Sequence, residues 1–102
     1  MLIGIHTSIG DGYDRAIEEG EKEGAEAVQI FVRQNLTWNK RAVTDEEAER
    51  FKRRLSDSAL IKQVIAHSSY LINLASDNKT TLKRSVSLLS DEIQICEKLG
   101  ID

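Results

Sequence analysis

The sequence contains no proline, one cysteine and one tryptophan among 102 residues, and its formal net charge is only −3. A single cysteine cannot form an internal disulfide, which excludes a disulfide scaffold and favours a reducing, cytoplasmic compartment. No segment reaches the roughly 18 consecutive apolar residues of a membrane-spanning helix, and the first residues lack the pattern of a secretory signal. The small net charge provides no bulk attraction to nucleic acid or membranes.

The residues that are present have the composition of a globular protein. Hydrophobic residues make up 40% of the chain and charged residues 30%, which is ordinary for a folded domain. At about 100–200 residues per domain, residues 1–102 are predicted to form a single domain. Because proline is absent, the turns must be made by glycine, asparagine and serine.

Three short apolar runs predict buried strands. Each run is rich in β-branched or aromatic residues and is followed by polar residues or glycine, which is typical of a strand that ends in a turn. The runs are Leu2–His6, Ala27–Val32 and Gln63–His67.

Three helical patterns alternate with these strands. The first has its apolar face at Tyr13, Ala16, Ile17 and Gly20. The second begins with a capping box, Thr44 followed by Glu47, and ends near Ser56–Ser58. The third, from about Asp77 to Leu99 and closed by Gly100, has apolar residues at spacings of 4, 3, 4 and 3, which predicts its packed face. That face comprises Leu82, Val86, Leu89, Ile93 and Cys96.

The order β-α-β-α-β-α predicts an α/β fold with a parallel sheet. Such sheets close either as a doubly wound sheet or as a (β/α)₈ barrel. Three units cannot close a barrel, and an isolated three-stranded sheet leaves two exposed edges. The chain stops at Asp102, just after Gly100, where a fourth strand is expected, so we expect a truncated part of a larger fold.

Polar residues follow each predicted strand, at the ends where parallel α/β folds bind ligands. They are His6, the segment Arg33–Trp38, and His67. A histidine there can be a hydrogen-bonded structural residue or a metal ligand. No second ligand lies at the close spacing of a zinc finger, so the spacing leaves both roles open.

Several segments resemble the endonuclease IV family. Residues His67–Ala75, which read HSSYLINLA, are similar to the family stretch H-x-S-Y-L-I-N-L-A. Ile3–Ser8 resembles its opening strand, and Ala27–Phe31 with the later Trp38 resembles its second strand. Glu92–Gly100 looks like the end of its third helix, so the resemblance covers the whole chain.

The resemblance implies the first three β/α units of a (β/α)₈ TIM barrel. The family comprises zinc-dependent endonucleases that cut double-stranded DNA at abasic sites, and the full-length enzyme is expected to be monomeric. His67 matches a ligand of one zinc ion in a three-ion cluster, which would stabilise charge on the phosphate. His6 matches no ligand, and we interpret it as a packing or hydrogen-bonding residue beside the site.

The same resemblance implies contacts with DNA. Tyr70 and Leu71 match positions that enter DNA at the damaged site, because a tyrosine can stack on a base and a leucine can wedge an opened step. Ile72 and Leu74 are expected to pack beneath this loop. Arg33, Asn35 and Trp38 are predicted to contact DNA from the preceding loop; solvation of the basic loop, a turn-ordering role for Asn35 and a packing role for Trp38 stay open as alternatives.

That preceding loop departs from the family pattern. The family has Asn-Pro-Arg-x-Trp, whereas this chain reads Asn35-Leu36-Thr37-Trp38. Leucine therefore replaces the arginine that probes the abasic gap, although Arg33, Lys40 and Arg41 keep the segment basic.

Three functions remain open from the sequence. The first is the N-terminal part of an enzyme that hydrolyses the phosphodiester 5′ to an abasic site, inactive as a 102-residue chain because further ligands are needed. The second is a metal-using sugar-phosphate isomerase or epimerase with the same barrel. The third is a truncated remnant without catalysis.

Overall fold

The computed structural model describes all residues from Met1 to Asp102. Strands and helices alternate along the chain, as predicted. The elements are β1 (Gly4–His6), α1 (Tyr13–Lys22), β2 (Ala27–Phe31), α2 (Asp45–Asp57), β3 (Gln63–His67) and α3 (Lys79–Leu99). The strands form one parallel sheet in the order β1-β2-β3. None of the helices combines the length and the apolar character that a membrane span requires.

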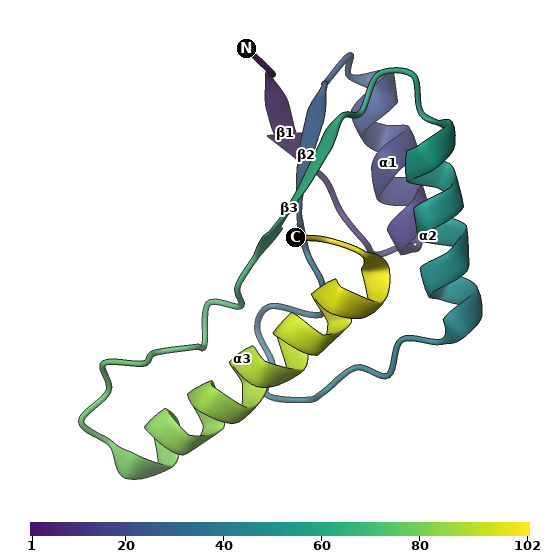
Figure 1. Ribbon diagram of the computed structural model, residues 1–102. Coiled ribbons are helices and arrows are strands. Elements are labelled where there is room, and N and C mark those ends of the chain that lie inside the picture. The colour runs from purple at the N-terminus through teal and green to yellow at the C-terminus, as the bar shows by residue number, and fades with distance from the viewer.

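One face of the sheet is covered by α1 and α2, which lie side by side (Figure 1). The core between these layers contains Val28, Ile30 and Val64 from the strands and Ile17 and Phe51 from the helices. Helix α1 approaches β2 closely at Gly20, where an added Cβ would lie 2.4 Å from Val28 Cγ1. Glycine at this position therefore permits the close packing of helix on sheet.

The opposite face of the sheet has no helix over it (Figure 1). Ile65, which points to that face because residues alternate along a strand, is 50% exposed. Both outer strands, β1 and β3, also pair on one side only. The sheet therefore has one open face and two open edges, as one part of a closed barrel would have.

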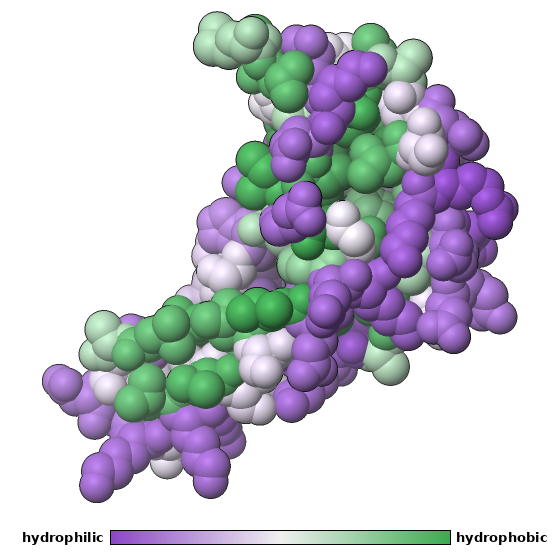
Figure 2. All heavy atoms as spheres, viewed as in Figure 1, coloured by the Kyte–Doolittle hydropathy of each residue, from purple (hydrophilic) through white to green (hydrophobic).

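Helix α3 packs with a different face from the one predicted. Val86 and Ile93, in the centre of the predicted stripe, are 54% and 58% exposed. Figure 2 shows apolar surface running along this helix. The buried residues are Ser85, Leu88, Glu92, Ile95 and Leu99. Two of these are polar and are hydrogen-bonded to the β3–α3 loop, a pattern that apolar periodicity alone cannot reveal.

Helix α2 begins with the predicted capping box. Thr44 Oγ1 accepts a hydrogen bond from the Glu47 amide at 3.1 Å, and the Glu47 carboxylate accepts one from the Thr44 amide at 3.0 Å. The hydrogen bond from the Thr44 amide holds the pKa of Glu47 below its usual range, and the guanidinium of Arg41 lowers this pKa further. The helix is thus fixed at the point where the long β2–α2 loop ends.

The lowered pKa of Glu47 predicts a pH dependence of stability. A carboxyl whose pKa is depressed by folding contributes stability that is present above its unfolded pKa and is lost as the pH falls through the folded pKa. We expect Glu47→Gln to lower the free energy of unfolding by about 0.3–1 kcal/mol at pH 7 and to have no effect at pH 2. Urea titrations at both pH values measure this, with the exposed Glu46→Gln as control. An equal loss at both pH values would contradict the assignment.

Candidate functional site

Four rings meet at the carboxyl ends of the three strands. Phe31, the last residue of β2, lies at the centre, with ring centroids 4.8 Å from His6, 5.0 Å from His67 and 5.2 Å from Tyr70. The parallel register places Phe31 opposite His67 and therefore brings β2 and β3 to the same edge. Both predicted histidines and Tyr70 thus belong to one aromatic cluster, whose central member, Phe31, sequence reasoning missed.

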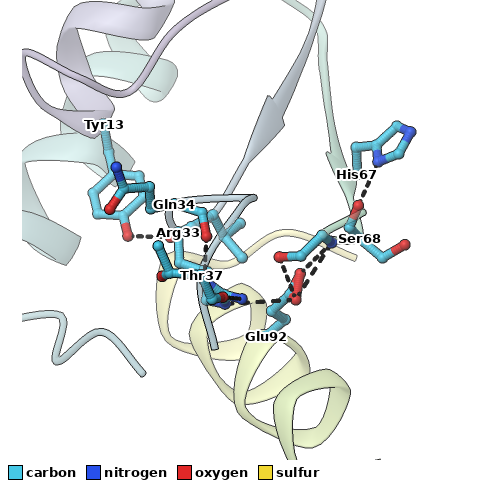
Figure 3. Close-up of polar contacts among 9 residues, drawn as sticks. Tyr13, Arg33, Gln34, Thr37, His67, Ser68 and Glu92 are labelled. Carbon is cyan, nitrogen blue, oxygen red and sulfur yellow. Dashed lines mark hydrogen bonds and ion pairs between the residues drawn. The ribbon is translucent and has the colours of Figure 1, made fainter. Parts of the chain in front are cut away.

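His67 is oriented by a local hydrogen bond. Its Nδ1 lies 2.6 Å from the carbonyl oxygen of Ser68, and since a carbonyl only accepts, Nδ1 carries the proton (Figure 3). The Nε2 atom then has a free lone pair, which is the state of a metal-ligating imidazole with an oriented ring. This geometry fits the predicted role of His67 as a zinc ligand.

The rest of a metal site is not found in this chain. No three His, Cys, Asp or Glu side chains lie together so that they could hold one metal ion. Within these 102 residues, His67 therefore has no set of neighbouring ligands.

His6 has the opposite tautomer. The side-chain amide nitrogen of Gln29 lies 3.2 Å from His6 Nδ1, and because an amide NH₂ only donates, His6 Nδ1 accepts. The proton of the neutral ring is then on Nε2, and Nδ1 is engaged by Gln29. The role of His6 as a packing or hydrogen-bonding residue beside the site stays a prediction.

The β3–α3 loop presents Tyr70 and Leu71 on a tight turn. The Ile72 amide donates to the Ser69 carbonyl at 3.2 Å, which makes Tyr70 and Leu71 the two central residues of a β-turn. Tyr70 is 65% exposed, whereas Leu71 is half-buried. Of the residues predicted to pack beneath the loop, Ile72 is half-buried, but Leu74 is 54% exposed, which contradicts the prediction for Leu74.

The position of Arg33 conflicts with its predicted role as a cation that contacts DNA. Its side chain is 1% exposed. The guanidinium donates to the carbonyl oxygens of Gln34 and Thr37 and lies 3.8 Å from the Glu92 carboxylate (Figure 3). Arg33 therefore holds the β2–α2 loop from within and is not free to neutralise a phosphate.

Asn35 and Trp38 lie on different sides of the same loop. Asn35 lines a cavity of about 540 Å³ between the β1–α1 and β2–α2 loops, together with His6, Phe31 and Arg41. Trp38 is half-buried, and the guanidinium carbon of Arg84 on α3 lies 5.9 Å from its ring centroid. The indole is thus engaged with α3, whereas Asn35 borders open space. Leu36, in the place of the family arginine, is 68% exposed.

Tyr13 secures the start of this loop. Its hydroxyl donates to the carbonyl oxygen of Val32, directly after β2, and Figure 3 shows this contact. Burial of the ring raises the pKa of Tyr13 to about 12, so the hydroxyl keeps its proton and stays a donor at any physiological pH. Helix α1 thereby fixes the end of β2, where Phe31 lies.

A second group that sequence reasoning missed is buried behind the turn. The Glu92 carboxylate on α3 accepts hydrogen bonds from the Ser69 amide and the Ser69 hydroxyl, both at 2.9 Å. Glu92 is 4% exposed. The sequence gives no sign that Glu92 is buried. It lies one position away from the predicted apolar face of α3, where a glutamate is expected to be solvated.

Comparison with known protein families identifies the fold. The family described as xylose isomerase-like TIM barrel matches residues 17–102. The chain therefore belongs to this family and forms three of the β/α units of its barrel.

Within that family, the chain is similar along its whole length to endonuclease IV proteins. It is 38% identical over 102 residues to "Probable endonuclease 4" of Thermotoga maritima, covering 99% of this chain and 36% of the relative. The relative with that name from Cenarchaeum symbiosum is 37% identical over 102 residues, with coverages of 99% and 36%.

A solved structure has the same fold. The crystal structure of endonuclease IV from Thermus thermophilus superposes with a TM-score of 0.90 at 32% identity, covering 99% of this chain and 38% of that one. The resemblance to the N-terminal portion of the endonuclease IV family is confirmed. The chain spans about a third of the length of these relatives.

Proposed function

We propose that this chain supplies the first three β/α units of an enzyme that hydrolyses the phosphodiester on the 5′ side of abasic sites in double-stranded DNA. The observation that carries the proposal is the arrangement after β3. There, a histidine with a free Nε2 is followed by an exposed tyrosine on a rigid turn, and their ring centroids are 5.7 Å apart. The names of the similar proteins support a nuclease.

Further β/α units are required for the chemistry in this proposal. His67 would supply one zinc ligand, no cluster of three potential ligands exists within this chain, and the open sheet face and edges leave room for the other units. Bound zinc ions would lower the pKa of water and stabilise charge on the phosphate and the leaving 3′ oxygen. The 102-residue chain alone is therefore expected neither to hold the cluster nor to cut DNA, and the completed enzyme is expected to be a cytoplasmic monomer.

The residues of this chain would bind and orient the substrate. Tyr70 offers its ring to a base beside the gap, and Leu71, next to it on the turn, would wedge the opened step. Opening costs least where no base pair exists, which favours an abasic site. With Arg33 buried, Asn35 on the cavity wall would approach the strand, and the partly exposed Arg41 would exchange its partner Glu47 for a phosphate.

Replacing Tyr70 tests this DNA contact. Stacking on an aromatic side chain contributes about 1–3 kcal/mol per base, so Tyr70→Ala should weaken binding to an abasic duplex by about 5- to 150-fold, whereas Tyr70→Phe should retain it. Fluorescence anisotropy at low salt measures both affinities. Leu74→Ala, on the same loop and similarly exposed, is the matched control. Equal affinities for Tyr70→Ala and the unchanged chain would argue against stacking.

The sugar-phosphate isomerase or epimerase is the second candidate. The cavity of about 540 Å³ beside His6 has the size of a small-molecule site, and Arg41 and Asn35 on its wall could bind a phosphate group. Turnover of sugar phosphates without incision of abasic DNA, by a completed barrel, would favour this function. Absence of both activities in a correctly folded, zinc-loaded barrel would favour the non-catalytic remnant.

A further inference from the structure

The two loops proposed to face DNA are joined by a buried pair of opposite charges. Arg33 Nε, at the start of the β2–α2 loop, lies 3.8 Å from Glu92 Oε2, and their side chains are 1% and 5% exposed. Arg33 also donates to the carbonyls of Gln34 and Thr37, and therefore holds both sides of Asn35 and Leu36. Figure 3 shows Arg33 beside Gln34 and Thr37, with Glu92 facing it from α3.

The other side of Glu92 holds the β3–α3 loop. Both carboxylate oxygens accept from Ser69, one from its amide and one from its hydroxyl, each at 2.9 Å. Ser69 is 3% exposed and is the first residue of the β-turn that carries Tyr70 and Leu71. An unbroken series of polar contacts thus runs from one loop, through α3, to the turn of the other.

Stability alone does not account for a buried pair of this kind. Removing two charges from water costs about as much as their attraction returns, and apolar residues of similar volume often replace such pairs without loss. A salt bridge does, however, fix the relative position of the groups that it joins. Here those groups are the β2–α2 loop, the turn at Ser69 and helix α3, which carries Glu92.

We propose that Arg33 and Glu92 are positioning residues that set the β2–α2 loop and the Tyr70 turn in one fixed arrangement for binding an abasic site. This role rests on the proposed function. Neither residue touches the DNA. The pair acts through Ser69, whose amide and hydroxyl are both committed to Glu92.

The double variant Arg33→Met/Glu92→Leu separates positioning from stability. It leaves no unpaired buried charge, but the amide and hydroxyl of Ser69 lose their acceptor, so its urea midpoint should fall, and its affinity is compared under conditions in which circular dichroism shows both proteins fully folded. Its affinity for a duplex with one tetrahydrofuran abasic analogue should fall about 2- to 30-fold, the usual range for coupling through a side-chain network. The matched control is Arg54→Met/Glu21→Leu, which removes the half-buried α1–α2 ion pair away from the strand ends. Unchanged affinity in a folded Arg33→Met/Glu92→Leu variant would overturn the proposal.

Hydrogen exchange tests the same link without DNA. Arg33→Met replaces a residue of the first loop and leaves the Glu92 carboxylate without its cation, and exchange of the Ile72 amide, which closes the turn of the second loop, should accelerate more than exchange of the β2 amides, which report overall stability. Ser69→Ala keeps the charged pair and gives a second test if the double variant does not fold. It should accelerate exchange at Ile72 and weaken binding of the analogue duplex. Unchanged exchange at Ile72 in both variants would overturn the link. Failure of the unchanged chain to prefer the analogue duplex over an intact one would instead count against the proposed function.

Discussion

Replacing His67 by alanine should lower the zinc content of a barrel completed around this chain and abolish its incision of abasic DNA. The protein to test is a chimaera in which these 102 residues are followed by the part of the Thermotoga maritima relative that lies beyond the aligned segment. Loss of groups that only orient a ligand costs about 10- to 100-fold in metal affinity or activity, so loss of the ligand itself should lower the incision rate by more than about 100-fold. Metal analysis of the purified protein and incision of an abasic duplex measure the two effects.

His6→Ala is the matched control for this substitution. His6 lies in the same ring cluster, 4.8 Å from Phe31, but its Nδ1 accepts from Gln29 and its Nε2 carries the proton. The zinc content should therefore be unchanged in His6→Ala. An unchanged zinc content in His67→Ala, or an equal loss in both variants, would disprove the assignment of His67 as the ligand.

Replacing Phe51 by alanine should have the largest effect on folding. Phe51 is fully buried on α2, and its ring packs edge-on against Tyr13 with centroids 6.4 Å apart. Truncation of a buried phenylalanine costs about 3–5 kcal/mol, a large part of the stability of a small domain. Urea unfolding followed by circular dichroism should show this loss, or no folded state at all.

The control for Phe51 is Leu36→Ala, because Leu36 is 68% exposed. Surface substitutions of this kind change stability by less than about 0.5 kcal/mol. A loss below about 1 kcal/mol in Phe51→Ala would mean that α2 is not part of the core. The Phe51→Ala substitution also removes the packing that supports Tyr13 and hence the end of β2.

The fold follows from local signals that are easy to recognise in the sequence. Gln63–His67 forms a strand with the predicted bounds, and the capping box at Thr44 begins α2. Gly100 ends α3 in the left-handed conformation, with φ 74°. These features depend on residues close in sequence, and the alternation of strand and helix then leaves few topologies.

The packed face of α3 could not be predicted from apolar spacing. The spacing selects Val86 and Ile93, which are exposed, while Ser85 and Glu92 are buried. Ser85 accepts from the Asn73 amide at 2.9 Å and Glu92 binds Ser69, so the burial of both is set by a loop that precedes the helix. An exposed apolar stripe on α3 is also what a helix covered by further barrel units would show.

The location of the candidate site residues could be predicted from the sequence, but the contacts that hold them in place could not. His67 and Tyr70 come directly after a recognisable strand, so their location follows from the fold. Arg33 looked like a free cation because basic loop residues are usually solvated. Its burial depends on the carbonyls of Gln34 and Thr37 and on Glu92, 59 positions further along the chain (92 − 33), a partner that no local pattern indicates.

Incision of an abasic duplex by the completed barrel, with the product ends identified, tests the central claim most directly. The account predicts a single cut on the 5′ side of the abasic analogue that leaves a 3′-hydroxyl, and loss of that cut with His67→Ala but not with His6→Ala. A folded, zinc-loaded barrel that leaves the duplex intact, or that cuts equally well with His67→Ala, would contradict it.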